Sequence, residues 1–416
     1  MNRQTLSRAT AATLLGFAAL AGGGKSYASD LTMWVETDPN YEAAAKQEAA
    51  EYEKATGVHI KLSFVPWAQY GAKITAAFKA GSQPDLIEGV ASWLYAQKTG
   101  GQLSEAPADL ASLMPGIDKA SLVPVEWKDK YYGVPLNVNI DVGPLSLYNV
   151  DAFEKAGVTP KWSDWAAYVA DLQKLTITSN GKITRSGIEM MGGDQMNQFL
   201  NYFLQAGGKF YSDDKKSVQI NNKSGEVALQ TMYDLLNTAH VDSPELTDWV
   251  GIASGTAATI TYGPWYTATL KASFPNFKWG WATLPLIPNA AGPYFPGTNV
   301  WAWMVPTESP NKSAAWDYIR WLNNNTRRLA WSEKTGEIPA VQALWSEPTV
   351  ANDPRWAPWL PYLKYQIPLL YIGPQDTYQT VLTNMVTSVL LKQSSIPAAL
   401  KSAEDQLNQM LAGLPN

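Results

Sequence analysis

Aromatic side chains are numerous in this sequence and are suited to recognising a small molecule. The 416 residues include 18 tryptophans and 20 tyrosines. The C–H faces of a sugar ring stack on aromatic planes, while its hydroxyl groups need paired donors and acceptors. A place in the hydrophobic core is the alternative, because tryptophan is commonly buried. The tryptophans near expected strand ends are the best candidates to line a ligand cleft: Trp67, Trp93, Trp265 and Trp301.

Carboxylates and amides are the second suited group, because Asp and Asn can accept or exchange two hydrogen bonds with neighbouring hydroxyls. Glu36 and Asp38 follow the first expected strand, and Asp38 is equally suited to cap the helix that comes next. Asn139 and Asp141 lie in a later alternating stretch that also contains Asn137. Only some of these three positions can face the same side of a strand.

Three further segments bring polar groups to expected loops. Gly193 and Asp194 precede a helix, where backbone N–H groups can hold a polar ligand atom, or where Asp194 acts only as an N-cap. Ser92 lies beyond the third strand and is better placed for a ligand than Asp85, which we expect to hold the preceding turn. Arg355 would suit an anionic ligand; the alternative is an ordinary surface position.

Catalysis finds little support in the residue types. The two histidines, His59 and His240, do not have metal-ligand spacing. The sequence has no cysteine and no GxSxG motif, which argues against thiol or serine nucleophiles. We therefore expect a protein that is not an enzyme and needs neither metal nor cofactor. A secreted glycoside hydrolase with an Asp/Glu pair is the alternative that the sequence leaves open.

The first 28 residues have the pattern of a cleaved secretory signal. Arg3 and Arg8 precede an apolar run over 11–21, and small residues end at Ala28. With no cysteine available for lipidation, we expect a periplasmic protein without a lipid anchor. Removing the signal takes away three basic residues and changes the formal charge from −5 to −8, which argues against nucleic acid as a partner.

Strands alternate with helices at the start of the mature chain. Apolar runs at 31–35, 58–65 and 85–89 are separated by helical patterns at 41–56 and 67–80, and each helix is followed by a glycine. This alternation predicts an α/β fold with a mostly parallel sheet, whose ligands sit at the carboxyl ends of the strands. The length of about 388 residues after the signal suits two lobes.

Four segments in order resemble the family 1 extracellular solute-binding proteins of bacterial sugar ABC importers, the maltose-binding-protein-like group. They read LTMWVETDPNYEAAAKQEAAEYEKATG from 31, YYGVPLNVNIDVGPLSLYNVDAF from 131, AATITYGPWYTATL from 257, and WGWATLPLIPNAAGPYFPGTNVWAWMVPTESPNKSAAWDYIRWL from 279. EKTGEIPA and the closing helix extend the likeness. Many members carry paired glycines in the return loop, which here contains Gly297 and Thr298.

The resemblance implies a periplasmic binding protein fold, with two α/β lobes around a ligand cleft and three hinge crossings. We expect residues 29–138 and 266–325 in the N-terminal lobe, and 139–265 and 326–416 in the C-terminal lobe. It also implies that the protein is a monomer that captures a carbohydrate-like ligand and delivers it to the permease subunits of an ABC transporter. Gly297 and Thr298 would contact that ligand.

Overall fold

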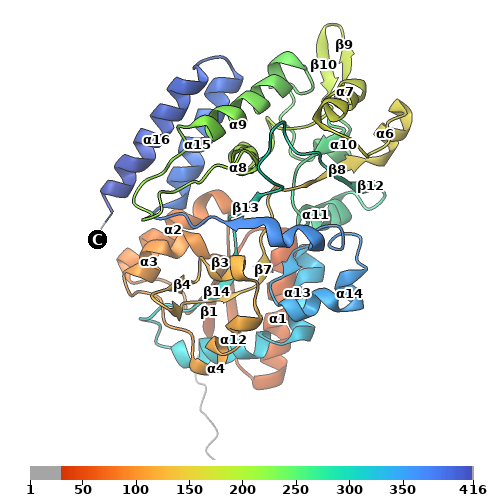
Figure 1. Ribbon diagram of the computed structural model, residues 1–416. Helices are drawn as coiled ribbons and strands as arrows, with labels where there is room; N and C mark the ends of the chain where they lie inside the picture. The colour runs from red at the N-terminus through yellow and green to blue at the C-terminus, as the bar shows by residue number, and fades with distance from the viewer. Residues whose placement is uncertain (1–29, 415–416) are drawn as a thin grey trace, which may run out of the picture.

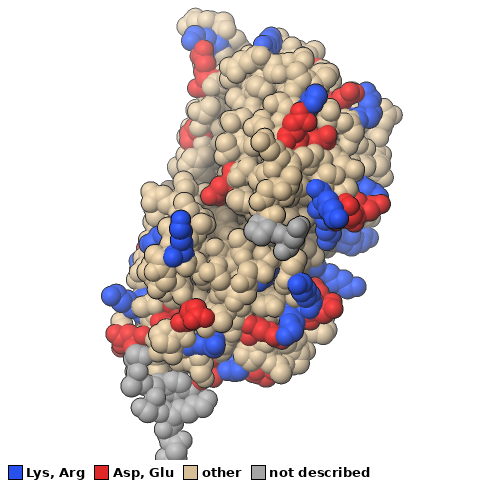
Figure 2. Space-filling model, turned by 90° about the vertical axis from the view of Figure 1, so that its left-hand side faces the viewer, with Lys and Arg blue, Asp and Glu red and all other residues tan. Residues whose placement is uncertain are grey.

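The computed structural model describes residues 30–414, so the predicted signal peptide at 1–28 lies outside the described residues. These residues form two lobes, one above the other in Figure 1, each with its own hydrophobic core. Within the described range, no helix has the length and apolar character needed to cross a membrane. On the face shown in Figure 2, acidic and basic side chains are interspersed.

The first lobe contains a five-stranded sheet of order β2-β1-β3-β14-β6. The strand β1 pairs in parallel with β2 and β3, whereas β14 is antiparallel to both β3 and β6. The three strands predicted near the N-terminus, β1, β2 and β3, are therefore adjacent and parallel in this sheet. The bounds are β1 Leu31–Glu36, β2 Ile60–Val65, β3 Leu86–Val90, β6 Val134–Pro135 and β14 Trp301–Met304.

Local sequence signals explain where the first helices begin and end. The helix α1, Pro39–Thr56, starts at Asp38, whose carboxylate accepts the backbone N–H groups of Asn40 and Tyr41. It ends at Gly57, which has φ 77°. The other elements of this lobe are α2 Trp67–Ala80, η1 Ala91–Leu94, α3 Tyr95–Thr99, α4 Ala108–Ala111, η2 Met114–Gly116, α5 Lys119–Leu122, β4 Glu126–Trp127, β5 Lys130–Tyr131, β7 Asn137–Val138, α12 Lys312–Leu322, α13 Asn325–Thr335 and β15 Ile338–Pro339.

The second lobe has a smaller antiparallel sheet of order β11-β8-β12 covered by helices. Its largest core is formed by residues of the helices α6, α7, α8, α9, α15 and α16, and a smaller cluster includes Leu147 and Ile260 of the sheet. The elements are β8 Leu145–Asn149, α6 Val150–Ala156, α7 Trp165–Leu175, β9 Ile177–Ser179, β10 Lys182–Arg185, α8 Gln195–Gln205, α9 Lys223–Tyr233, η3 Asp234–Thr238, α10 Gly251–Ser254, β11 Thr259–Ile260, α11 Tyr266–Ser273, β12 Trp279–Thr283, α15 Gln375–Leu390 and α16 Ile396–Ala412.

The chain passes between the lobes at three places. The first is the segment 139–144, which leads from β7 to β8, and the second is 298–300, which leads from β13 (Phe295–Gly297) to β14. The third crossing is the stretch that joins α14 (Pro348–Ala351) to α15, and Figure 1 shows it passing between the lobes. This stretch contains η5 Leu360–Tyr365 and β16 Gln366–Pro368, and it is preceded by η4 Gln342–Ser346.

The pairing of strands differs from the predicted lobe boundaries at two places. The predicted second crossing near residue 265 is wrong, because β11 and β12 both pair with β8 and keep residues 259–283 in the second lobe. The predicted start of the last segment at 326 is too early. The helix α13 packs on α1, and β15 pairs with β7, so the first lobe continues to at least residue 339.

The first crossing lies directly against the segment that follows β11. A Cβ atom at Gly263 would overlap the carbonyl oxygen of Ile140. Only glycine therefore permits this approach of two backbones without a local shift. The contact fixes the position of residues 264–266 relative to the first crossing.

Candidate functional site

Four aromatic side chains of the first lobe form a continuous group near the carboxyl ends of its strands. The ring centroids of Tyr41 and Trp301 are 4.5 Å apart, and those of Trp67 and Trp93 are 4.7 Å apart. Trp67 and Trp301 lie 6.3 Å apart and link the two pairs. Trp93 and Trp301 are buried, whereas Trp67 at the start of α2 is half-buried. Of the predicted stacking tryptophans in this lobe, Trp67 thus presents the most accessible surface.

Three carboxyl groups lie beside these rings. Glu36 ends β1, Asp38 caps α1, and Glu337 follows α13. The Tyr41 hydroxyl donates a hydrogen bond of 2.9 Å to Oε1 of Glu337. Burial, together with the charges of Asp38 and Glu337, raises the pKa of Glu36 to about 8. Burial also raises the pKa of Glu337 to about 8, opposed by hydrogen bonds from Asn137 and Tyr41.

Asp141 is the centre of a buried polar network at the first two crossings. Its Oδ2 accepts hydrogen bonds from Thr298 Oγ1 at 2.7 Å, Asn299 Nδ2 at 2.8 Å and Asn197 Nδ2 at 3.2 Å. Asn139 supports the same loop, because its Oδ1 accepts the backbone N–H of Asn299 at 2.9 Å. The predicted residues Asn139, Asp141 and Thr298 are therefore brought together by the two crossing segments.

The network continues into both lobes. Asn299 Oδ1 accepts from Gln375 Nε2 at 2.7 Å, and Gln375 Oε1 accepts from Ser92 Oγ at 2.5 Å. On the other side, Asp194 Oδ2 accepts from Asn197 Nδ2 at 2.6 Å. Ser92 belongs to the first lobe and Gln375 begins α15 of the second. The network therefore includes a direct hydrogen bond between the lobes.

The electrostatic setting of the network is acidic. Burial, together with the charge of Asp194, raises the pKa of Asp141 to about 7, against hydrogen bonds from Thr298, Asn139 and Asn299. Burial also raises the pKa of Asp194. The Oδ1 atom of Asp194 accepts the backbone N–H of Asn197, so the predicted N-cap of α8 is present. The same residue thus both caps a helix and bonds a network side chain.

The second lobe contributes a separate group of aromatic rings. Trp265 lies 5.3 Å from Tyr262 and 5.6 Å from Tyr266 between ring centroids. Its indole is half-buried, and its Nε1 has no hydrogen-bond partner among residues 30–414. A Cβ at Gly336 would lie 2.9 Å from the carbonyl oxygen of Trp265, so these two backbones are in contact. The backbone of Trp265 therefore lies next to Gly336 of the first lobe, the residue that precedes Glu337.

Some predicted residues are placed differently. The Arg355 guanidinium binds Asp353, with 2.7 Å between Nη2 and Oδ2, and lies 4.3 Å from the Trp356 ring. Its partners are thus within its own segment. Gly297 gives room to the Gln366 side chain, which donates to the carbonyl of Asn139. Gly193 is half-buried, and a Cβ there would lie 3.7 Å from the Tyr262 hydroxyl oxygen.

Sequence reasoning did not single out several residues that complete the site. Glu337 and Tyr41 belong to the carboxylate group, while Asn197, Asn299 and Gln375 belong to the network. Asn197 lies three residues after the recognised cap Asp194, which was the one local signal available. Together the residues offer aromatic faces and clustered donors and acceptors, the combination that a polyhydroxylated ring requires.

A two-lobed α/β fold with this site where the lobes meet defines a solute-binding protein. The family model of bacterial extracellular solute-binding proteins matches residues 38–326. The chain therefore belongs to this family. The predicted fold and family are confirmed, and the chain's role is to bind a solute.

Relatives cover most of the chain at low identity. A maltooligosaccharide ABC transporter solute-binding lipoprotein of Streptococcus pneumoniae is 24% identical over 393 residues, covering 92% of this chain and 89% of the relative. A galactooligosaccharide-binding protein of Bacillus subtilis is 25% identical, covering 78% and 76%.

Solved structures share the fold. A solute-binding protein of Thermotoga lettingae bound with α-D-tagatose has a TM-score of 0.78 at 23% identity, covering 92% of this chain and 100% of that one. A maltose/maltodextrin-binding domain of Bdellovibrio bacteriovorus bound to maltotriose has a TM-score of 0.79 at 18% identity, covering 92% and 100%.

Proposed function

We propose that this protein is the substrate-binding component of an ABC importer and that its solute is a carbohydrate. The observation that carries the proposal is the junction of the lobes. The Asp141 network joins the two crossing segments there, Trp301 follows the second crossing, and Tyr262 and Trp265 adjoin Gly263, which lies against Ile140 of the first. Such a surface combines apolar stacking faces with paired donors and acceptors. The relatives named above for oligosaccharides support the same class of ligand.

The rest of the proposal concerns location and partners. The mature protein begins near Ser29 after signal cleavage, resides in the periplasm as a monomer, and delivers its solute to permease subunits in the inner membrane. The charged N-terminal residues followed by an apolar run support export. Intact-mass analysis of protein from the periplasmic fraction tests the cleavage, and sedimentation velocity tests the monomer.

The binding role is tested by measuring ligand-induced shifts of the melting temperature with mono-, di- and trisaccharides. A ligand that binds only the folded state at about 100 times its dissociation constant adds about 2.7 kcal/mol of stability. The bound saccharide is then recovered by denaturation and its mass determined. Intact saccharide at a stoichiometry near one supports the proposal, whereas recovery of hydrolysed product would identify a glycoside hydrolase instead.

A further inference from the structure

The first residues of α15 contact the first lobe, although the rest of this helix belongs to the second lobe. The helix packs on α8, α9 and α16, and Figure 1 shows its lower end beside α2. At this end, Gln375 Oε1 accepts a hydrogen bond of 2.5 Å from Ser92 Oγ in η1. A Cβ atom at Gly71 of α2 would lie 2.9 Å from Oδ2 of the next residue, Asp376. Two consecutive residues of α15 thus meet two different elements of the first lobe.

The hydrogen bond between Ser92 and Gln375 depends on how the lobes are arranged. Ser92 is 1% exposed and Gln375 is 3% exposed, so both side chains are shielded from water in this arrangement. Ser92 moves with the first lobe and Gln375 with the second, because each lies on an element of its own lobe. If the lobes move apart, the two side chains lose each other and become hydrated. The bond therefore stabilises only the arrangement in which the lobes are apposed.

Gln375 also connects Ser92 to the Asp141 network, through a chain of hydrogen bonds that has one direction. Gln375 Nε2 donates to Asn299 Oδ1 at 2.7 Å, and Asn299 Nδ2 donates to Asp141 Oδ2 at 2.8 Å. Because Asp141 Oδ2 is the acceptor at the end of this chain, Asn299 turns its amide nitrogen to Asp141 and its oxygen to Gln375. Gln375 in turn presents its own oxygen to the first lobe, where the Ser92 hydroxyl is a matching donor.

We propose that Gln375 is a positioning residue for solute binding, and that its hydrogen bond to Ser92 is a latch that favours the apposed arrangement of the lobes. Periplasmic binding proteins close around their ligands by hinge motions. An interaction that is present in only one arrangement shifts the equilibrium toward that arrangement. This inference goes beyond the proposed function, since it concerns the lobes and not the class of solute.

The latch has two measurable consequences. Without it, the ratio of separated to apposed molecules should rise about three- to tenfold, which is the net effect expected of one buried hydrogen bond. The affinity for the solute should fall as well, because the apparent dissociation constant increases as the binding-competent fraction of the protein decreases. The second consequence rests on the proposed function, whereas the first does not.

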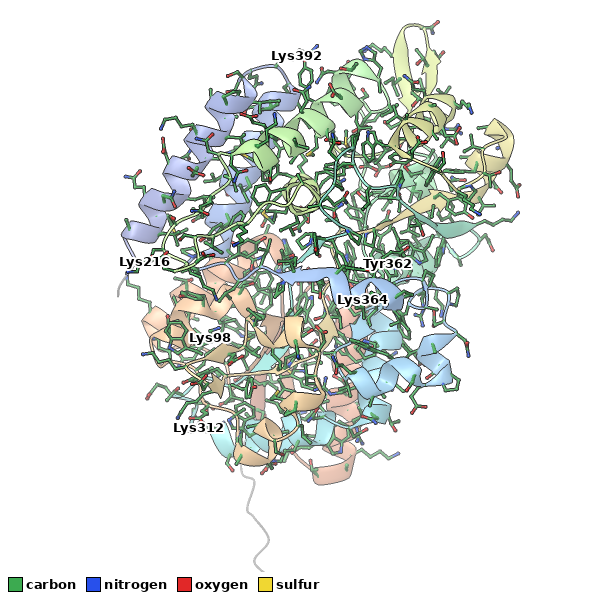
Figure 3. All side chains as sticks on the ribbon, viewed as in Figure 1. Lys98, Lys216, Lys312, Tyr362, Lys364 and Lys392 are labelled. Carbon is green, nitrogen blue, oxygen red and sulfur yellow. The ribbon has the colours of Figure 1, made fainter. Side chains whose placement is uncertain are left out.

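The first test measures the separation of the lobes in the protein without any solute. The sequence has no cysteine, so Lys216→Cys and Lys312→Cys can carry a pair of spin labels without a competing thiol. Both lysines are exposed, and Figure 3 shows Lys216 on the second lobe and Lys312 on the first. Double electron–electron resonance then gives the distribution of distances between the labels, and hence the ratio of separated to apposed molecules.

Two variants of the labelled protein remove the latch from either side. Ser92→Ala deletes the hydroxyl donor, and Gln375→Met keeps the length of the side chain but loses both of its hydrogen bonds. Each should raise the ratio about three- to tenfold. The double variant should differ from Gln375→Met by less than about twofold, because the two residues share one bond. Unchanged distances in both single variants, or effects that multiply in the double variant, would overturn the inference.

Ser186→Ala is the matched control for Ser92→Ala. Ser186 is 0% exposed and donates a hydrogen bond of 2.8 Å to Asp242 Oδ1, so its bond is buried like the latch but lies within the second lobe. The control should lose folding stability and leave the distance distribution unchanged. A shift as large as that of Ser92→Ala would show that the distances report a general loss of stability, and the latch would be refuted.

The second test uses maltotriose as the probe and measures its affinity by calorimetric titration. Binding to Ser92→Ala and Gln375→Met should be about three- to tenfold weaker than binding to the natural protein, and binding to Ser186→Ala should change by less than about twofold. If maltotriose binds and the latch variants keep the natural distances, the latch inference fails and the saccharide-binding function stands. If the variants shift the distances and maltotriose does not bind, the latch stands and maltotriose is not the solute.

Discussion

The Tyr41 hydroxyl donates a 2.9 Å hydrogen bond to Glu337 Oε1 across a separation of 296 residues. The bond joins the first turn of α1 to the segment after α13, two parts of the first lobe that are separated in sequence by the second-lobe residues 145–297. It holds the carboxyl group against the aromatic faces. The orientation of Glu337 therefore depends on Tyr41, a residue far from it in the sequence but in contact with it in the fold.

Replacing Tyr41 by Phe should destabilise the protein, because it removes the hydroxyl that donates to Oε1 of the buried Glu337. The expected cost in unfolding free energy is about 1–3 kcal/mol, measured by urea denaturation. Tyr318→Phe is the matched control, since the Tyr318 hydroxyl is buried and has no hydrogen-bond partner within residues 30–414. Equal losses in the two variants would mean that the Tyr41 hydroxyl contributes nothing through Glu337.

Trp265→Ala should weaken saccharide binding by about 1.5–3 kcal/mol, through lost stacking and lost apolar burial. Its indole is half-buried, and its Nε1 has no hydrogen-bond partner in the described part of the chain, so the loss of folding stability should be smaller than for a core residue. Trp303→Ala provides the comparison. Trp303 is 0% exposed and bonded to Glu88, and its removal should cost about 3–5 kcal/mol of stability. A large stability loss with normal affinity in Trp265→Ala would place this residue in the core instead.

Gly263→Ala should disturb the hinge, because the added methyl group overlaps the Ile140 carbonyl. Overpacking of this kind costs about 1–3 kcal/mol, and small-angle scattering should show a changed separation of the lobes. Gly116→Ala is a suitable control, since none of the described residues beyond its chain neighbours has an atom within 4 Å of its Cβ position. It should change stability by less than about 0.5 kcal/mol. Similar behaviour of both variants would show that the contact at Ile140 relaxes freely.

The stability of the ligand-free protein should fall as the pH rises from about 5 to about 8. Burial raises the pKa of Glu36, Glu189 and Glu337 to about 8, so the folded state keeps protons that the unfolded chain releases at lower pH. Since the unfolded state then binds fewer protons, the unfolding free energy decreases with pH. Thermal melts across this range measure the slope, and a flat or rising profile would contradict the expectation.

Glu189→Gln should make the unfolding free energy less dependent on pH. Glu189 is 3% exposed, neither carboxylate oxygen has a partner among residues 30–414, and burial followed by the charges of Asp242 and Asp248 raises its pKa. The variant should be roughly 1–3 kcal/mol more stable than the natural protein at pH 8.5, with little difference at pH 5.5. Identical pH profiles would indicate that Glu189 is not the source of the dependence.

The elements of the first lobe could be predicted because their signals are local. Asp38 and Gly57 mark the two ends of α1, and the predicted helix 67–80 has the bounds that the structure gives to α2. The second crossing was misplaced because its position depends on β11 and β12 pairing with β8, and such long-range pairing leaves little trace in local sequence.

The site was predictable only where a residue type coincided with an expected strand or helix end, as for Asn139, Asp141 and Asp194. Glu337 follows a helix with a mostly polar sequence, where a glutamate is normally solvated. Its burial arises from packing against Tyr41 and the aromatic group, which no pattern near residue 337 records. The assignment of the individual ligand contacts stays a prediction.

The place of β14 in the first sheet sets the order in which the protein can fold. Within residues 30–414, β14 lies between β3 and β6 and is the strand that connects them. Until residue 304 has been synthesised, β3 has one open edge and β6 has no partner in the sheet. The N-terminal lobe therefore cannot complete its native structure before the intervening 156 residues from Leu145 to Val300 have left the ribosome. This delay keeps the nascent chain incompletely folded for most of its synthesis, the condition under which an unfolded polypeptide can be threaded across a membrane.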